Sequence, residues 1–117
     1  MVFEMSGRSL RDLQDMLRKL YFHHDSKRGV ERTYSWLLTE VWELGKAVER
    51  GSEEEMRGEF ADVLAWLLSL ANLVGIDVEE AVVSKYWGRC PKCQSLPCKC
   101  EFREGPGKSV EISLKKG

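Results

Sequence analysis

Residues 37–86 of this chain, LLTEVWELGKAVERGSEEEMRGEFADVLAWLLSLANLVGIDVEEAVVSKY, decide its fold. Apolar residues recur in this stretch at the three- and four-residue spacing of α-helices, and Gly51 and Gly75 interrupt the pattern. Three helices are therefore predicted, over residues 33–50, 52–74 and 77–87. The middle helix is apolar on nearly every side, which indicates a central position in a bundle or at a subunit interface.

One more helix is predicted before this stretch. Ser9 can cap a helix that runs to about Phe22, because leucine and methionine recur there at helical spacing. The polar residues 23–32 contain Gly29 and predict a loop that leads to the next helix. The expected fold class is therefore all-α, with four main helices in a bundle.

The size and charge of the chain restrict its partners. Its 117 residues suffice for one domain with a modest core, and we expect a homodimer or tetramer because a second subunit would bury more apolar surface. With 18 basic and 19 acidic side chains, it lacks the positive charge typical of nucleic-acid and membrane-surface binders. The longest apolar run, residues 63–76, is shorter than the roughly 18 to 20 residues of a membrane span. Residues 1–10 include Glu4 and Arg8 and do not resemble a signal peptide, so we expect a cytoplasmic protein.

Four carboxylates stand out on the predicted helices: Glu40 and Glu43 on one, Glu59 and Asp62 on the next. Residues three apart project from the same face of a helix. Carboxylates that face each other on packed helices repel and lose hydration unless a cation lies between them, so the pattern predicts a Mg²⁺ site and a phosphate substrate. The alternative is that these acids are solvated or only favour a helix N-terminus.

With these acids, residues 37–86 resemble the MazG-like nucleotide pyrophosphohydrolases of the all-α NTP pyrophosphatase superfamily, and the resemblance extends over about residues 9–88. It implies a helical catalytic domain, residues 1–88, that uses Mg²⁺ to hydrolyse nucleoside triphosphates to a monophosphate and pyrophosphate and so cleans the nucleotide pool. The four acids match the family's metal ligands, and Glu40 or Glu43 is the expected general base. The preferred base and sugar stay open.

The sequence departs from the family pattern at Thr39, where other members carry a glutamate. This departure leaves open how many Mg²⁺ ions bind. It also keeps an alternative function in view, in which the active site has decayed and a helical dimer serves as a zinc-knuckle interaction module.

Four further residues are candidates for substrate binding. Lys85 occupies the position of the family's phosphate-binding lysine, with Arg89 one turn later; the alternative is that both are solvated cations at a helix end. Trp36 and Trp66 lie four residues from an acid, and either indole can stack on a nucleobase or belong to the core.

Residues 89–117 form a second expected unit that contains four cysteines, Cys90, Cys93, Cys98 and Cys100. Four thiolates can bind Zn²⁺ tetrahedrally, so we predict a structural zinc knuckle. Because the loop between the cysteine pairs is short, disulfides or a site shared between subunits are the alternatives. The alternation of Val110, Ile112 and Leu114 after it fits a small hairpin or a mobile tail.

Overall fold

The computed structural model describes residues 7–105 and contains four α-helices and, within those residues, no strand. The helices are α1 (Leu10–Arg28), α2 (Val30–Arg50), α3 (Glu53–Val74) and α4 (Val78–Tyr86). The predicted all-α class and helix order are confirmed. The possible strand at residues 110–114 lies outside the described residues.

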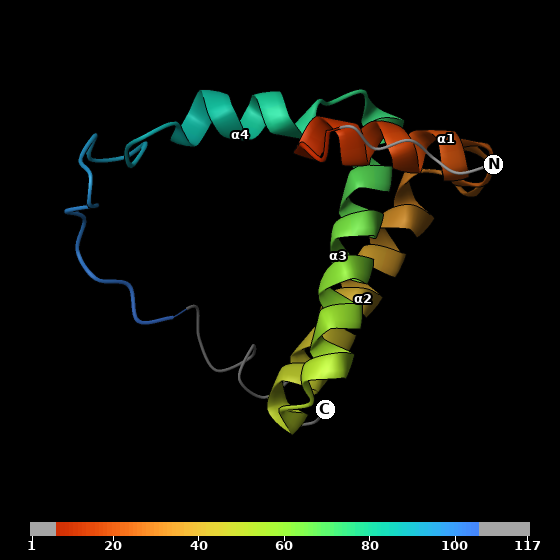
Figure 1. Ribbon diagram of the computed structural model, residues 1–117, viewed down its shortest axis with the longest axis horizontal. Coiled ribbons are helices and arrows are strands. Elements are labelled where there is room, and N and C mark those ends of the chain that lie inside the picture. Colours follow the sequence, from red (N-terminus) through yellow and green to blue (C-terminus); the bar gives the residue numbers. More distant parts are fainter. Residues whose placement is uncertain (1–6, 106–117) are drawn as a thin grey trace.

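The helices form an open arrangement. α2 and α3 run side by side along most of their length, and α1 lies across one end of this pair (Figure 1). α4 contacts α1 and then extends away from the paired helices, with the cysteine segment beyond it (Figure 1). No single helix in residues 7–105 meets the length and apolarity that a membrane span needs; α3 and α4 meet them only as a pair, which is bent by 99°.

The caps predicted from the sequence form. The Ser9 hydroxyl accepts a hydrogen bond from the backbone N–H of Asp12, whose side chain bonds back to Ser9, and Ser52 caps α3 through the N–H of Glu55. Gly75 ends α3 in the left-handed conformation. These side chains and the glycine satisfy backbone groups that helix ends leave unpaired.

The predicted loop at residues 23–32 is wrong. α1 continues to Arg28, Gly29 alone separates the two helices, and α2 begins at Val30. The polar segment contains no proline, and its basic residues Lys27 and Arg28 suit the last turn of a helix. The segment is polar because its helical turns mostly face solvent. Within it only Gly29, at φ 91° and ψ 167°, has a conformation that other residues rarely adopt.

A buried polar network joins α1 to the corner between α3 and α4. The Gln14 amide nitrogen donates to Asn72 Oδ1 at 3.1 Å and to the Ile76 carbonyl at 2.8 Å. The Gln14 amide oxygen accepts from the N–H of Val78 at 3.0 Å. At the surface of the same corner, Arg11 pairs with Asp77 at 2.6 Å. These bonds fix the start of α4 against α1.

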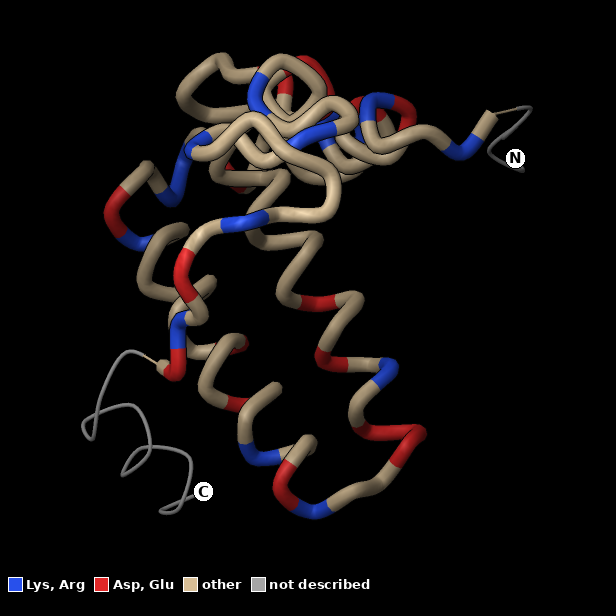
Figure 2. Tube along the Cα trace, turned by 90° about the vertical axis from the view of Figure 1, so that its left-hand side faces the viewer, with Lys and Arg blue, Asp and Glu red and all other residues tan. Residues whose placement is uncertain are grey.

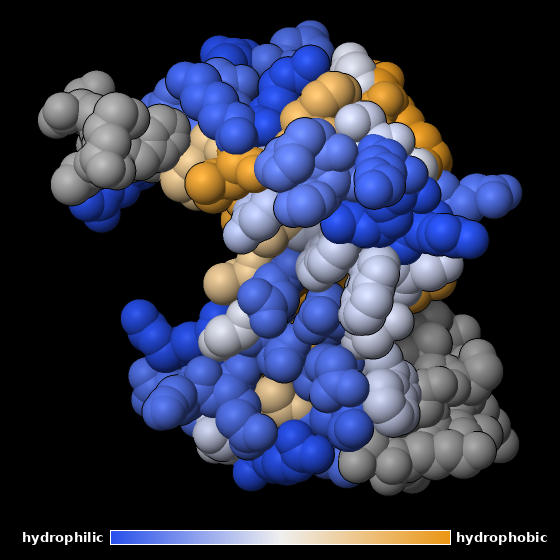
Figure 3. Space-filling model, turned by 90° about the vertical axis from the view of Figure 1, so that its right-hand side faces the viewer, coloured by the Kyte–Doolittle hydropathy of each residue, from blue (hydrophilic) through white to orange (hydrophobic). Residues whose placement is uncertain are grey.

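The core of one chain is small. Among the described residues the buried apolar side chains are few, and they come from α1, α2 and α3: Leu17, Leu37, Ala47, Leu68 and Ala71. Large apolar side chains remain exposed on every helix, among them Phe60 (60% exposed) and Tyr86 (55%). Apolar patches are visible on one face of the molecule, mainly in its upper half (Figure 3). A single chain therefore leaves uncovered much of the surface that a folded protein normally buries.

Candidate active site

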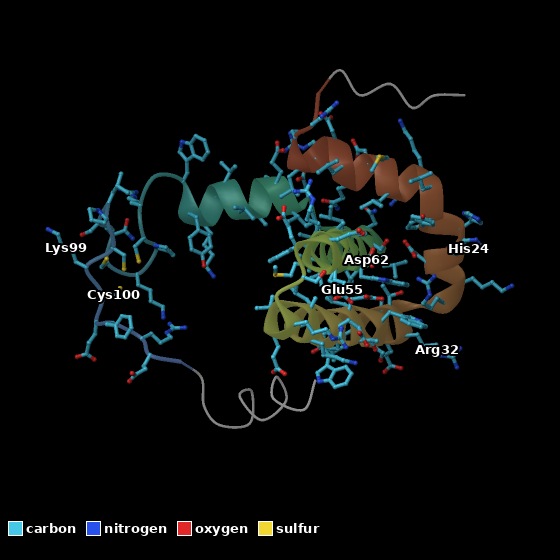
Figure 4. All side chains as sticks on the ribbon, turned by 60° about the horizontal axis from the view of Figure 1, so that its bottom comes forward. His24, Arg32, Glu55, Asp62, Lys99 and Cys100 are labelled. Atoms are coloured by element: carbon cyan, nitrogen blue, oxygen red, sulfur yellow. The ribbon has the colours of Figure 1, made fainter. Side chains whose placement is uncertain are left out.

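Three of the four predicted carboxylates converge between α2 and α3. Glu40 lies on α2, Glu59 and Asp62 lie one turn apart on α3, and one oxygen of each lies within 4.8 Å of the others. Figure 2 shows acidic residues along both of these long helices, and Figure 4 shows Asp62 between the helices of the main body. The three-residue spacing and the packing of α2 on α3 account for this convergence.

The convergence is electrostatically costly for the protein alone. Glu40 and Glu59 are half-buried, and Glu59 Oε1 is fully buried with no hydrogen-bond partner among the described residues. Burial foremost, together with the neighbouring carboxyl groups of Glu59 and Asp62, raises the pKa of Glu40 to about 7. Carboxylate oxygens without donors, held this close together, are the ligand set that a hard divalent cation such as Mg²⁺ prefers. These residues therefore fit a magnesium ion.

Glu43 is not part of this three-carboxylate group. Its side chain lies 3.8 Å from Lys46 Nζ, and Lys46 also lies over the ring of Trp42. Thr39 donates a hydrogen bond to the Ser35 carbonyl at 3.1 Å and is exposed. The neighbours of Glu40 on α2 are therefore engaged within their own helix.

Trp36 and Trp66 meet across α2 and α3. Their rings stack with centroids 5.6 Å apart and an interplanar angle of 13°. Trp36 is half exposed, and the guanidinium of Arg28 lies 4.7 Å from the centre of the Trp66 ring. The two indoles therefore pack on each other, as expected if they belong to the core. They nevertheless lie beside the carboxylates.

A cavity of about 310 Å³ adjoins the carboxylates. α1 and α3 line it, and Asp62 belongs both to its wall and to the carboxylate group. Asp25, only 2% exposed, and Arg28 lie in this wall and form an ion pair at 2.8 Å. Neither residue was predicted as part of the site, because their polar segment was expected to be a loop; the i, i+3 spacing of their opposite charges was the available signal for a helix.

Lys85 and Arg89 do not reach the carboxylates within one chain. They line a separate pocket at the end of α4, together with Trp87 and Gln94, and this pocket shares no residue with the cavity beside Asp62. Lys85 lies over the ring of Tyr86 at 5.6 Å.

The four cysteines of one chain converge at a second centre. Their sulfur atoms lie within 4.8 Å of one another, with Cys90 to Cys100 at 3.8 Å and Cys93 to Cys98 at 3.9 Å. Backbone N–H groups, that of Lys99 foremost, lower the pKa of Cys93 to about 6. The cluster can bind a metal ion without a second chain. It lies far from Asp62, beyond the end of α4 (Figure 4).

The described part of the chain thus contains helices and no strand, a carboxylate group that can hold a metal ion, and a neighbouring cavity large enough for a small ligand. Residues 28–94 match the family model of the MazG nucleotide pyrophosphohydrolase domain. The match covers more than half of the chain and includes all four predicted acids, so the chain belongs to the MazG nucleotide pyrophosphohydrolase family. This confirms the resemblance seen in the sequence, and the family uses Mg²⁺. A search of curated proteins found no match.

Proposed function

We propose that this chain is a Mg²⁺-dependent nucleoside triphosphate pyrophosphohydrolase that cleaves the bond between the α and β phosphates and helps to clean the nucleotide pool. The observation that carries this proposal is Glu59 Oε1, which is buried and has no hydrogen-bond partner in residues 7–105, within the carboxylate group of Glu40, Glu59 and Asp62. A protein gains nothing in stability from such an arrangement, since an unpaired buried acceptor costs about 1 to 3 kcal/mol. Binding of a cation explains why the arrangement exists.

The residues that would hold the ion are Glu40, Glu59 and Asp62. A Mg²⁺ ion bound there would neutralise the charge of the phosphate oxygens and lower the pKa of a coordinated water. Family membership supports this assignment.

Glu40 is the better of the two predicted general bases. It lies in the carboxylate group, whereas Glu43 lies beside Lys46. In the proposed reaction a water oxygen bonds to the α phosphorus, the bond from that phosphorus to the bridging oxygen breaks, and pyrophosphate leaves with the bonding electrons. Glu40 accepts the proton of the water. Glu43 orients that water or provides one more ligand for the metal ion.

Pyrophosphate release, measured over a set of canonical and damaged nucleotides with and without Mg²⁺, tests the proposal. We expect equal amounts of monophosphate and pyrophosphate with Mg²⁺ and none without it. Asp62→Asn is expected to abolish release, and Glu49→Gln, a similar change at an exposed site on α2, to retain it. If the wild-type chain stays at the level of the blank with every nucleotide, the proposal is wrong and the decayed interaction module becomes the better description.

We further propose that the active form is a homodimer, with a tetramer as a second possible assembly. Phe60, Leu64 and Leu67 form an exposed stripe along α3, and Leu38, Val41 and Trp42 are exposed on the neighbouring helix α2. Exposed large apolar side chains on two adjacent helices are of the type that subunits bury. Light scattering on a size-exclusion column should give a multiple of 13.5 kDa, and Phe60→Glu should shift the mass toward one chain.

We also propose that the cysteine cluster holds one structural Zn²⁺. Four sulfurs about 2.3 Å from a tetrahedral ion lie about 3.8 Å from one another, whereas a disulfide needs about 2.05 Å. The sulfur separations of 3.8 and 3.9 Å match the metal geometry. Elemental analysis should find one zinc per chain, and none after Cys98→Ser. The domain boundary near residue 88 and the cytoplasmic location remain proposals.

A further inference from the structure

The cavity between α1 and α3 is placed to receive part of any ligand held at the carboxylates. Asp62 is common to both, so a molecule whose phosphates reach Glu40, Glu59 and Asp62 has its remaining atoms beside the cavity. The volume, about 310 Å³, lies at the small end of ligand sites, as suits one planar ring system. The described residues that line it come from two helices: Tyr21, His24, Asp25 and Arg28 of α1, and Asp62, Ala65, Trp66 and Ser69 of α3.

The cavity is lined by the aromatic ring of Trp66 and by the charged side chains of Arg28 and Asp25, which form an ion pair. Trp66 is backed by Trp36 on α2, so its ring is held in one plane beside the cavity. Arg28 lies over the same ring at 4.7 Å. Aromatic rings and guanidinium groups stack on nucleobases of any type, so these residues favour a base without selecting one.

Asp25 supplies the selective group. Arg28 Nη1 donates to its Oδ1 at 2.8 Å, whereas its Oδ2 is buried and has no hydrogen-bond partner among the described residues. A carboxylate oxygen can only accept, so the missing partner must be a donor. Oδ2 is buried, so a ligand reaches it only when a neighbouring side chain moves; the cavity that Asp25 lines also includes the exposed side chains of Tyr21 and His24.

We propose that the cavity receives the nucleobase and that Asp25 Oδ2 accepts a hydrogen bond from an exocyclic amino group, so that cytosine and adenine are preferred over uracil, thymine and hypoxanthine. This inference rests on the proposed nucleotide substrate. An oxo group at the same position brings a lone pair against the carboxylate and leaves it without a donor. A site that hydrogen-bonds one substrate group discriminates strongly against the analogue that lacks it.

The test is equilibrium binding of α,β-methylene analogues, whose α–β linkage is not hydrolysed, measured by tryptophan fluorescence with Mg²⁺. The pairs to compare are the dCTP and dUTP analogues and the dATP and dITP analogues. Each pair differs at one ring position, by an amino or an oxo group together with the protonation of the adjacent ring nitrogen. We expect the amino member to bind about 10- to 100-fold more tightly in both pairs. Equal binding, tighter binding of the oxo member, or no binding of any analogue overturns the inference.

Asp25→Asn gives a sharper test because Arg28 fixes the orientation of the new amide. The amide oxygen should stay toward the Arg28 donor, which puts the amide NH₂ where Oδ2 was. A donor then faces the base, and the preference should reverse toward the dUTP and dITP analogues. Asp15→Asn, the same change at an exposed site of α1 outside the cavity, should keep the wild-type preference.

The outcomes separate this inference from the proposed function. If the amino analogues bind more tightly but no nucleotide is hydrolysed, the inference holds and the hydrolase proposal fails. If nucleotides are hydrolysed but Asp25→Asn weakens both members of each pair equally, Asp25 only holds the helices together and the inference fails. Should Asp25→Asn unfold, judged by circular dichroism, the wild-type ratios alone decide.

Discussion

Replacing Glu59 by glutamine should stabilise the protein when Mg²⁺ is absent and remove its response to Mg²⁺. Glu59 lies within 4.8 Å of carboxylate oxygens on both Glu40 and Asp62. The substitution removes one charge from this group and offers Glu40 an amide donor, with little change in shape. A site selected for binding a cation is expected to carry such a cost in the free protein.

The size of the effect follows from Coulomb's law. Two unit charges 4.8 Å apart repel by about 0.9 kcal/mol in bulk water and about 3.5 kcal/mol at an effective dielectric constant of 20. Because Asp62 is exposed, we take about 1 kcal/mol for each of the two pairs that Glu59 makes when all three groups are ionised. Glu59→Gln should therefore add about 2 kcal/mol, or about 6 to 8 °C in the unfolding midpoint of a chain this size.

The assay is thermal unfolding at pH 8, followed by circular dichroism, with 0 and 10 mM Mg²⁺. The wild type should gain about 2.7 kcal/mol when Mg²⁺ is about 100 times its dissociation constant, and Glu59→Gln should gain almost nothing. Glu49→Gln, an exposed site on α2, controls for the loss of one negative charge. If Glu59→Gln lowers the midpoint equally with and without Mg²⁺, Glu59 has a structural role and the reasoning is refuted.

Three other results should follow. Without Mg²⁺ the unfolding midpoint should fall as pH rises from about 5 to 7, because the pKa of Glu40 is raised from 4.5 to about 7 and only the folded state keeps the proton in this window; the fall should be smaller in Glu59→Gln and is measured by pH-dependent melting. Gly29→Ala should cost about 1 to 3 kcal/mol in chemical denaturation, since its φ of 91° and ψ of 167° suit only glycine. Removal of zinc should speed tryptic cleavage after Lys92 and Lys99 and leave the helical signal unchanged, as limited proteolysis and circular dichroism can show.

Much of the fold was predictable because local signals agree with the tertiary structure. Ser9, Ser52 and Gly75 bound helices where the sequence predicts, since capping depends on the side chain and its next few neighbours. The junction at Gly29 was not predictable from polarity, because a helix that faces solvent over most of its surface is as polar as a loop. Gln14 was also missed, since its partners lie about sixty residues away and no local pattern reports them.

The candidate site was predictable in part. Spacing put Glu59 and Asp62 on one face, and the packing of α2 on α3 brings Glu40 to them. The same spacing grouped Glu43 with Glu40, but the structure pairs Glu43 with Lys46, three residues further along the same helix. Periodicity gives the face of a helix, whereas the rotamer that a charged side chain adopts on that face depends on its neighbours in space.

Gly29 alone joins α1 to α2, so the shape of the cavity depends on the number of residues at this junction. An extra residue that continued either helix would turn the side chains beyond it by about 100° around the axis. Asp25 and Arg28 would then leave the wall that they share with Asp62. Insertions at this corner should therefore be damaging, even though Gly29 is not among the residues that line the cavity.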